Sequence, residues 1–360
     1  MPCHPAITTV SLGHSQTYTI QEKLHACAKH NIHAIELFYD DLEALARSIT
    51  TTTTNTLCTD PHTHPPKAAL LTAATQIHTL ATTLDIKILS LQPLRFAEGL
   101  LDRTAQAHIL TDVLPLWLTL AQALHTDTIL IASNFLPPDP QTGAPRTTAN
   151  RTTIADDLRA LAQAAAPTKL AYEALAWSPH VNTWEAAYDV VQRVNEPNFG
   201  LAVDAFNVAA AIYPSPDVAL SPASVSAADA ALALSLARLV AEVDPARLFV
   251  VQMADAERLL APLDERHPFY DAARPPRMSW SRNARLFLGE MHMGGFLPVV
   301  EVVKAVVVGL GWEGWVSFEV FSRFLVGPGD VPWENAERAA RSWEWVVGEV
   351  WGVSCGEEDV

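Results

Sequence analysis

Short apolar runs alternate with longer amphipathic stretches along almost the whole of this 360-residue chain. Eight of the apolar runs have the length and the Val, Ile and Leu content typical of buried parallel strands. We predict strands at 6–12, 33–39, 87–92, 128–133, 169–175, 200–206, 248–254 and 315–321. The stretches between them are rich in Ala, Leu, Glu and Arg and predict helices at 20–30, 68–84, 105–124, 154–165, 184–194, 227–243 and 298–308.

Eight successive units of strand and helix predict an α/β fold, a closed (β/α)8 TIM barrel. The alternative is an open doubly wound sheet, but no predicted strand is followed by the glycine-rich phosphate turn of dinucleotide-binding sheets. We expect residues 1–330 to form one barrel domain and residues 331–360 to form a C-terminal helix that packs on it and ends in an acidic tail. The irregular stretches 48–66, 137–148 and 260–293 predict long loops at the top of the barrel.

Composition and charge narrow the classes of function. The formal net charge of −16, from 24 basic and 40 acidic residues, argues against binding to nucleic acid or to anionic membranes. The four cysteines form no CxxC motif, which indicates free thiols and a reducing compartment. The longest apolar stretch, 299–310, is too short to cross a bilayer. We therefore expect a soluble, cytoplasmic protein that acts on a small molecule.

Each of the last four predicted strands carries one oxygen-bearing polar side chain near its C-terminal end: Glu173, Asp204, Gln252 and Glu319. A carboxylate in an apolar strand is unfavourable unless it is paired or bound to a cation. Because the active sites of TIM barrels form at these strand ends, the four side chains can reach one ion. Three carboxylates and an amide are hard oxygen ligands and favour Mg²⁺ or Mn²⁺. The alternative is that neighbouring basic or backbone groups satisfy each of them.

Several longer motifs narrow the prediction further: AYEALAW at 171–177, PNFGLAVDAFN at 197–207, MSWSRNARLF at 278–287 and WVSFEVFSR at 315–323. Together they resemble fungal-type 3-dehydroshikimate dehydratases, a branch of the xylose-isomerase-like TIM barrels. The resemblance implies a hydro-lyase of quinate and shikimate catabolism that converts 3-dehydroshikimate to protocatechuate (3,4-dihydroxybenzoate). It also implies abstraction of an α proton, a metal-stabilised enolate and loss of water. The metal ligands of the family map onto the four side chains above.

This implied reaction needs a base, an acid and a group that binds the substrate carboxylate. We choose His180 as the base, since an unperturbed imidazole has a pKa near ~6.5. Glu36 and Glu98 are further acid or base candidates, although each of the three residues could instead have a structural role. We choose Arg282 and Arg285 for the carboxylate because a guanidinium can bind it through two parallel hydrogen bonds.

Three alternatives stay open at this point. A sugar isomerase or epimerase could use the same barrel and the same metal. A non-catalytic barrel could bind a metal or a small molecule, because a fold alone does not fix a function. A metal-dependent DNA-repair endonuclease of related fold would need additional histidine ligands and a basic face, neither of which is evident. The resident ion and the formation of a homo-oligomer are also left open.

Overall fold

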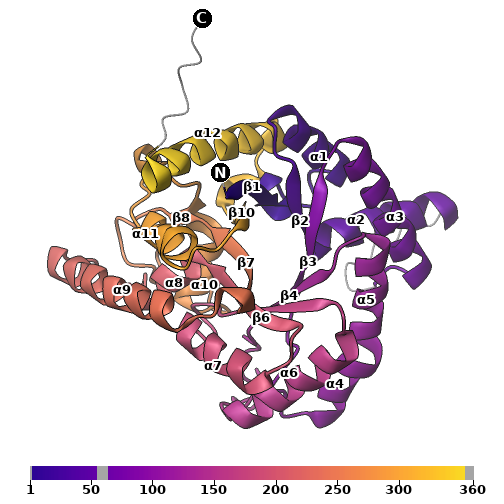
Figure 1. Cartoon of the computed structure of the whole chain (residues 1–360), viewed down its shortest axis with the longest axis horizontal. Coiled ribbons are helices and arrows are strands. Elements are labelled where there is room, and N and C mark those ends of the chain that lie inside the picture. The colour runs from indigo at the N-terminus through magenta and orange to yellow at the C-terminus, as the bar shows by residue number, and fades with distance from the viewer. Residues whose placement is uncertain (1, 55–63, 353–360) are drawn as a thin grey trace, which may run out of the picture.

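A closed barrel of eight parallel strands forms the centre of the molecule (Figure 1). The computed structural model describes residues 2–54 and 64–352. Neighbouring strands follow the order β1-β10-β7-β6-β5-β4-β3-β2 around the barrel. The strands are β1 (Cys3–Thr8), β2 (Ala34–Phe38), β3 (Lys87–Leu94), β4 (Thr128–Ala132), β5 (Lys169–Glu173), β6 (Phe199–Asp204), β7 (Leu248–Met253) and β10 (Gly314–Phe318). The predicted (β/α)8 barrel is confirmed.

Helices surround the barrel on its outside (Figure 1). They are α1 (Ile20–Lys29), α2 (Tyr39–Thr54), α3 (Lys67–Thr83), α4 (Arg103–His108), α5 (Leu114–Ala123), α6 (Arg151–Ala165), α7 (Trp184–Val194), α8 (Ala205–Ile212), α9 (Pro222–Glu242), α10 (Pro276–Ala284), α11 (Val299–Lys304) and α12 (Val331–Trp351). The last helix, α12, packs against α1, so a helix near each end of the described chain lies against the other. The division into a barrel domain and a separate C-terminal helix stays a prediction.

Local sequence signals set the ends of several helices. At the start of α7, the Thr183 hydroxyl accepts a hydrogen bond from the backbone N–H of Ala186, which satisfies one of the free donors of the first turn. At its other end, Asn195 adopts a left-handed conformation with φ of 52°, which stops the helix. The sequence therefore predicts both ends of this helix correctly.

Some of the sequence predictions were wrong. The first strand covers Cys3–Thr8, earlier than the predicted 6–12, and Thr9–Leu12 form a 3-10 turn instead. The threonine-rich stretch 48–66 does not begin as a loop, because α2 continues to Thr54. Residues 55–63 of that stretch and the acidic tail at 356–360 lie outside the described residues.

Helices α8 and α10 were also missed. Helix α8 follows β6 without a connecting loop, and the run from 200 to 212 is apolar enough to hide the change from strand to helix period. Helix α10 lies inside the predicted long loop 260–293 and starts with a proline at its first position. Both helices carry residues of the candidate site described below.

Successive side chains along each strand point alternately into the barrel and outward to the helices. Ala171 and Ala202 form a small inner cluster with Leu130 and Val250. Tyr172, between Ala171 and the last residue of β5, belongs instead to the large core between strands and helices. Because successive side chains of a strand point to opposite faces, the last residue of β5 points into the barrel.

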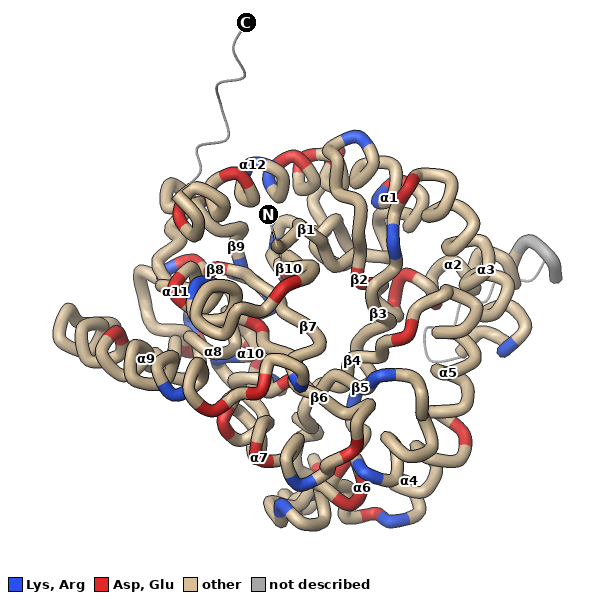
Figure 2. The backbone as a smooth tube through the Cα atoms, viewed as in Figure 1, with Lys and Arg blue, Asp and Glu red and all other residues tan. Residues whose placement is uncertain are grey.

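The outer surface is mixed in charge, and one of its helices is notably apolar. Figure 2 shows Lys and Arg interspersed with Asp and Glu around the ring of helices. Among the helices of the described residues, α9 alone is long and apolar enough to span a membrane, a criterion that a helix of a soluble protein can also meet. Its Leu232, Leu236 and Leu239 are buried in the hydrophobic core.

Candidate metal centre and active site

Three carboxylates converge at the C-terminal end of the barrel. Glu173 is the last residue of β5, Asp204 is the last residue of β6, and Glu319 directly follows β10. One carboxylate oxygen of each lies within 4.8 Å of those of the other two, and all three residues are buried. The three residues therefore form a candidate site for a metal ion.

Gln252 lies on β7, between the strands that carry Asp204 and Glu319. Its side chain is fully buried, and its Nε2 donates a hydrogen bond of 2.9 Å to Glu36 Oε1. Its Oε1 has no hydrogen-bond partner among the described residues. An unpaired buried acceptor is costly, so this oxygen is available to a ligand that the site would bind.

Glu36 on β2 holds the Gln252 amide in this orientation. Its Oε2 accepts a hydrogen bond of 2.8 Å from Ser90 Oγ on β3, which fixes the carboxylate from the other side. Burial raises the pKa of Glu36, and the hydrogen bond from Gln252 lowers it in part. The structure therefore places Glu36 next to the predicted ligands, in contact with one of them.

Asn207 is a residue that the sequence reasoning missed. Its Nδ2 lies 2.8 Å from both Glu173 Oε1 and Asp204 Oδ2, so one amide group ties two of the carboxylates together. Its Oδ1 accepts a hydrogen bond from the backbone N–H of Ala176, which fixes the amide. The available signal was its position three residues after Asp204, which places the two side chains on one side of α8.

Arg285 reaches into the same cluster. Its Nη1 lies 2.8 Å from Asp204 Oδ2 and 3.1 Å from Glu319 Oε2, and its Nε donates to Ser281 Oγ. The guanidinium is stacked 4.1 Å from the centre of the Phe206 ring. Its Nη2 is buried and has no partner among the described residues. The Nη2 group and its N–H donors therefore remain free on a guanidinium that already contacts two carboxylates.

The acidic groups repel one another in this buried setting. Burial raises the pKa of Glu173, and the charges of Glu319 and Asp204 raise it further. Burial likewise raises the pKa of Asp204 and of Glu319, while Arg285 partly opposes the rise. When ionised, these three carboxylates and the single guanidinium leave two negative charges. One divalent cation would neutralise them, and the donor set is the all-oxygen type that such hard ions prefer.

Arg282, one turn earlier on α10, is the second cation beside the cluster. Its guanidinium lies 4.1 Å from the centre of the Phe321 ring, and the guanidinium of Arg285 lies 5.3 Å from the same ring. Arg282 makes no hydrogen bond or ion pair with any residue that the structure describes. Burial, and next the charge of Arg95, lower the pKa of Arg282 to about 10. An unpaired cation beside other cations favours the binding of an anion.

The structure does not bring His180 to this cluster. His180 Nε2 lies 3.1 Å from Thr147 Oγ1, and its carbonyl oxygen accepts a hydrogen bond from Arg151 Nη2. Thr147 lies in the segment between β4 and α6, and Arg151 is the first residue of α6. None of the contacts found in the described part of the chain joins the imidazole to the three carboxylates.

Glu98 is also separate from the cluster. Its Oε1 accepts hydrogen bonds from the backbone N–H of Asn134 at 2.7 Å and from the hydroxyl of Tyr172 at 2.9 Å. Tyr172 points away from the inside of the barrel, so Glu98 lies on the outer side of β5. Burial raises the pKa of Glu98 to about 8.

Comparison with known proteins gives consistent matches. The family model described as "Xylose isomerase-like TIM barrel" matches residues 24–346. A 3-dehydroshikimate dehydratase of Neurospora crassa is 40% identical over 96% of this chain and 94% of the relative. A 3-dehydroshikimate dehydratase of Pseudomonas aeruginosa is 30% identical over 88% of this chain, which spans only 38% of that longer protein.

A solved structure agrees with the fold. It is a xylose isomerase-like TIM barrel/4-hydroxyphenylpyruvate dioxygenase fusion protein, with a TM-score of 0.67 and 24% sequence identity. The match covers 97% of this chain and 43% of the fusion protein.

Proposed function

The chain belongs to the xylose isomerase-like TIM barrel family, and on this premise we propose that it is a 3-dehydroshikimate dehydratase. Such a hydro-lyase removes water from 3-dehydroshikimate and yields protocatechuate. The observation that carries the proposal is the buried Glu173, Asp204 and Glu319 cluster, in a chain 40% identical to the Neurospora enzyme over almost its whole length.

The donor atoms fit a hard divalent cation, Mg²⁺ or Mn²⁺. Glu173, Asp204 and Glu319 would supply carboxylate oxygens, and Gln252 would supply the amide oxygen that has no other partner. When bound, such an ion supplies Lewis-acid stabilisation of negative charge on the substrate ketone oxygen as the α proton leaves. Glu36 and Asn207 keep the ligand atoms in place through the hydrogen bonds described above.

Two arginines support recognition of the substrate carboxylate. Arg282 has no polar partner among the residues described, and Arg285 has a free Nη2. Both guanidinium groups lie over Phe321, so one carboxylate placed beside that ring could accept from both. The aromatic faces of Phe321 and Trp177 beside Arg282 would also exclude water from the substrate ring.

The acid and base assignments have unequal support. Of the three candidates, Glu36 alone contacts the cluster, and its hydrogen bonds to Gln252 and Ser90 support a positioning role. The contacts of Glu98 support a structural role on the outer side of β5. His180 as the base stays a prediction without support from its contacts. A cytoplasmic location is likewise proposed, from the free cysteines and the acidic composition.

A direct assay tests the proposed function. Purified protein is freed of metal with a chelator and incubated with 3-dehydroshikimate, alone or with added Mg²⁺ or Mn²⁺. We expect the ultraviolet absorbance of protocatechuate to grow only after a divalent ion is returned. Turnover that is unchanged by the chelator, or no turnover with any ion, would contradict the proposal. Conversion of a sugar without this absorbance would favour an isomerase instead.

A further inference from the structure

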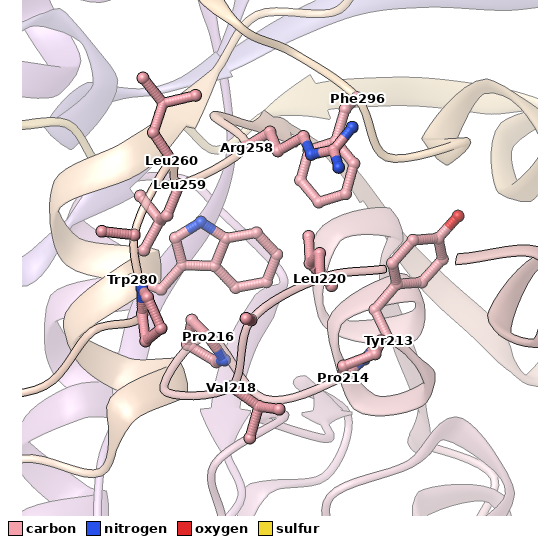
Figure 3. Close-up of a pocket in the computed structure, with 13 residues that line it drawn as sticks. Tyr213, Pro214, Pro216, Val218, Leu220, Arg258, Leu259, Leu260, Trp280 and Phe296 are labelled. Carbon is pink, nitrogen blue, oxygen red and sulfur yellow. The ribbon is translucent and has the colours of Figure 1, made fainter. Parts of the chain in front are cut away.

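A second cavity lies outside the candidate active site. It has a volume of about 280 Å³ and is bounded by the segment after α8 and the segment after β8 (Asp255–Ala256). Backbone atoms join the two segments, because the Leu263 N–H donates to the carbonyl of Pro216. Arg277 at the start of α10 joins this helix to the end of α8 with hydrogen bonds to the carbonyls of Ala210 and Tyr213. The cavity is therefore built into the fold, as Figure 3 shows.

Aromatic rings form much of the cavity wall. Trp280 and Phe296 are 6.2 Å apart between ring centres, and Phe296 and Tyr213 are 5.8 Å apart. The polar atoms of two of these rings are already satisfied: Trp280 Nε1 donates to the Glu257 carbonyl, and the Tyr213 hydroxyl donates to Asp229. Figure 3 shows Trp280 facing Leu220 across the cavity. The wall thus offers ring faces and aliphatic groups and suits a flat apolar body.

One cation lies at the rim of this cavity. Arg258 and Phe296 both line the cavity and are drawn in Figure 3. The Arg258 guanidinium makes no hydrogen bond or ion pair with the described residues, although its backbone N–H donates to Gly294. The neighbouring carboxylate of Glu257 is occupied by Arg323, with which it forms an ion pair of 2.6 Å. The guanidinium is therefore free to bind an anion.

The rim also exposes aliphatic side chains. Leu260 is fully exposed and Val218 is 57% exposed, and both line the cavity. Scattered apolar residues are ordinary on a surface, but here they adjoin a cavity and an unpaired arginine. A cavity of about 150 Å³ already accommodates benzene in a protein interior, so this larger one has room for a ring with a carboxyl group.

We propose that this cavity is a second binding site, for a small planar aromatic carboxylate. The ring would lie between Trp280 and Leu220, and its carboxylate would bind Arg258 at the rim. The site is distinct from the acidic cluster, but Trp280 belongs to the same helix as Arg282 and packs 5.3 Å from Phe206, on which Arg285 is stacked. The product of the proposed reaction belongs to this chemical class, although the binding site itself does not depend on that reaction.

Calorimetric titration of the Mn²⁺-loaded protein with benzoate tests the proposal. We expect two binding events, one at the active-site arginines and one at the cavity. Arg258→Gln should weaken the second about tenfold or more, and Leu220→Trp should abolish it by filling the cavity. Arg266→Gln is the matched control, because it removes an exposed arginine from the same segment that does not line the cavity. Arg282→Gln should affect only the first event.

Benzyl alcohol is the matched neutral probe. It should bind the wild type and Arg258→Gln equally, since it lacks the carboxylate. A single benzoate event that Arg282→Gln removes, or an Arg258→Gln titration identical to that of the wild type, would overturn the proposal. So would a concentration-dependent dimer in sedimentation that Leu260→Ser disperses, because the apolar rim would then belong to an interface between copies. Failure of the dehydratase assay would leave the cavity test unaffected.

Discussion

Two buried glutamates lie on opposite sides of strand β5 and share little except their burial. Glu173 points into the barrel, where its carboxylate meets those of Asp204 and Glu319. Glu98 lies on the outer side, where it accepts hydrogen bonds from the Tyr172 hydroxyl and a backbone N–H. Burial raises the pKa of both. A raised pKa alone therefore does not distinguish a functional carboxylate from a structural one.

The difference lies in what surrounds each group. Neutral donors surround Glu98, so a protonated carboxyl is stable there without any ion. Like charges surround Glu173, and the one cation in contact with them, Arg285, reaches Asp204 and Glu319. Gln252 Oε1 is also unpaired, so the inner cluster is incomplete without a further cation. At the outer site, the carboxyl atom without a hydrogen-bond partner among the described residues is Glu98 Oε2.

Isosteric removal of one carboxylate from each side should produce the largest contrast. Glu319→Gln should lower kcat at least about a hundredfold, because loss of a direct ligand should exceed the 10- to 100-fold effect of losing an outer partner of a ligand. Glu98→Gln should leave the rate of protocatechuate formation within about threefold of wild type. Both variants should keep the wild-type circular dichroism spectrum. Equal losses of activity in the two variants would remove the distinction drawn between the sites.

The arginines offer a test of the inner site that does not touch a proposed metal ligand. Arg282→Ala should raise KM about 10- to 100-fold with a smaller change in kcat, as expected for loss of a charge-assisted hydrogen bond worth about 1.5–3 kcal/mol. Arg274→Ala is a suitable control, because that arginine pairs with Asp271 on the same segment. Arg285→Ala should also weaken substrate binding, since it removes the Nη2 group that has no partner among the described residues. A wild-type KM in Arg282→Ala would exclude that residue from substrate binding.

Strand position was enough to find the carboxylates, because parallel strands in a barrel end at one common face. Glu173, Asp204 and Glu319 were predicted in this way and do converge. Asn207 and the contacts of Arg285 were missed, because they depend on α8 starting directly at Asp204 and on α10 forming within a stretch that was predicted to be a loop. The choice of His180 relied on nearness in sequence to Glu173. The contacts of His180 are with Thr147 and Arg151, so its choice as the base stays a prediction.

Substitution of Glu36 tests whether the inner cluster depends on the residues that hold its ligand atoms in place. A carboxylate can only accept, so Glu36 keeps Nε2 of Gln252 toward itself and leaves Oε1 free. Glu36→Gln offers both a donor and an acceptor and would allow the amide of Gln252 to turn over. We expect Mn²⁺ affinity, measured by electron paramagnetic resonance, to fall about 10- to 100-fold. Ser90→Ala should have a smaller effect, and unchanged affinity in Glu36→Gln would contradict the positioning role.

The outer site is tested by a property other than activity, the pH dependence of stability. An unfolded glutamate has a pKa of about 4.3, and the folded pKa of Glu98 is about 8. Between these values the folded protein binds more protons at this position than the unfolded chain does. The unfolding free energy therefore falls as the pH rises, by up to about 1.4 kcal/mol per pH unit. Below a pH of about 4.3, Glu98 is protonated in both the folded and the unfolded state, and its stabilising contribution to the unfolding free energy is fully retained.

Glu98→Gln removes this titration, so the variant should gain stability relative to wild type as the pH rises from 5 to 8. Urea unfolding of both proteins at several pH values measures the difference in unfolding free energy. The contributions of the inner carboxylates cancel in this difference because both proteins contain them. At low pH the wild type should be equal or more stable, since a protonated glutamate fits the Tyr172 hydroxyl and the Asn134 N–H at least as well as an amide. A difference that stays constant across this range would mean that Glu98 is ionised at neutral pH. Glu98 would then need a cationic partner just as Glu173 does, and the two sides of β5 would no longer differ in kind.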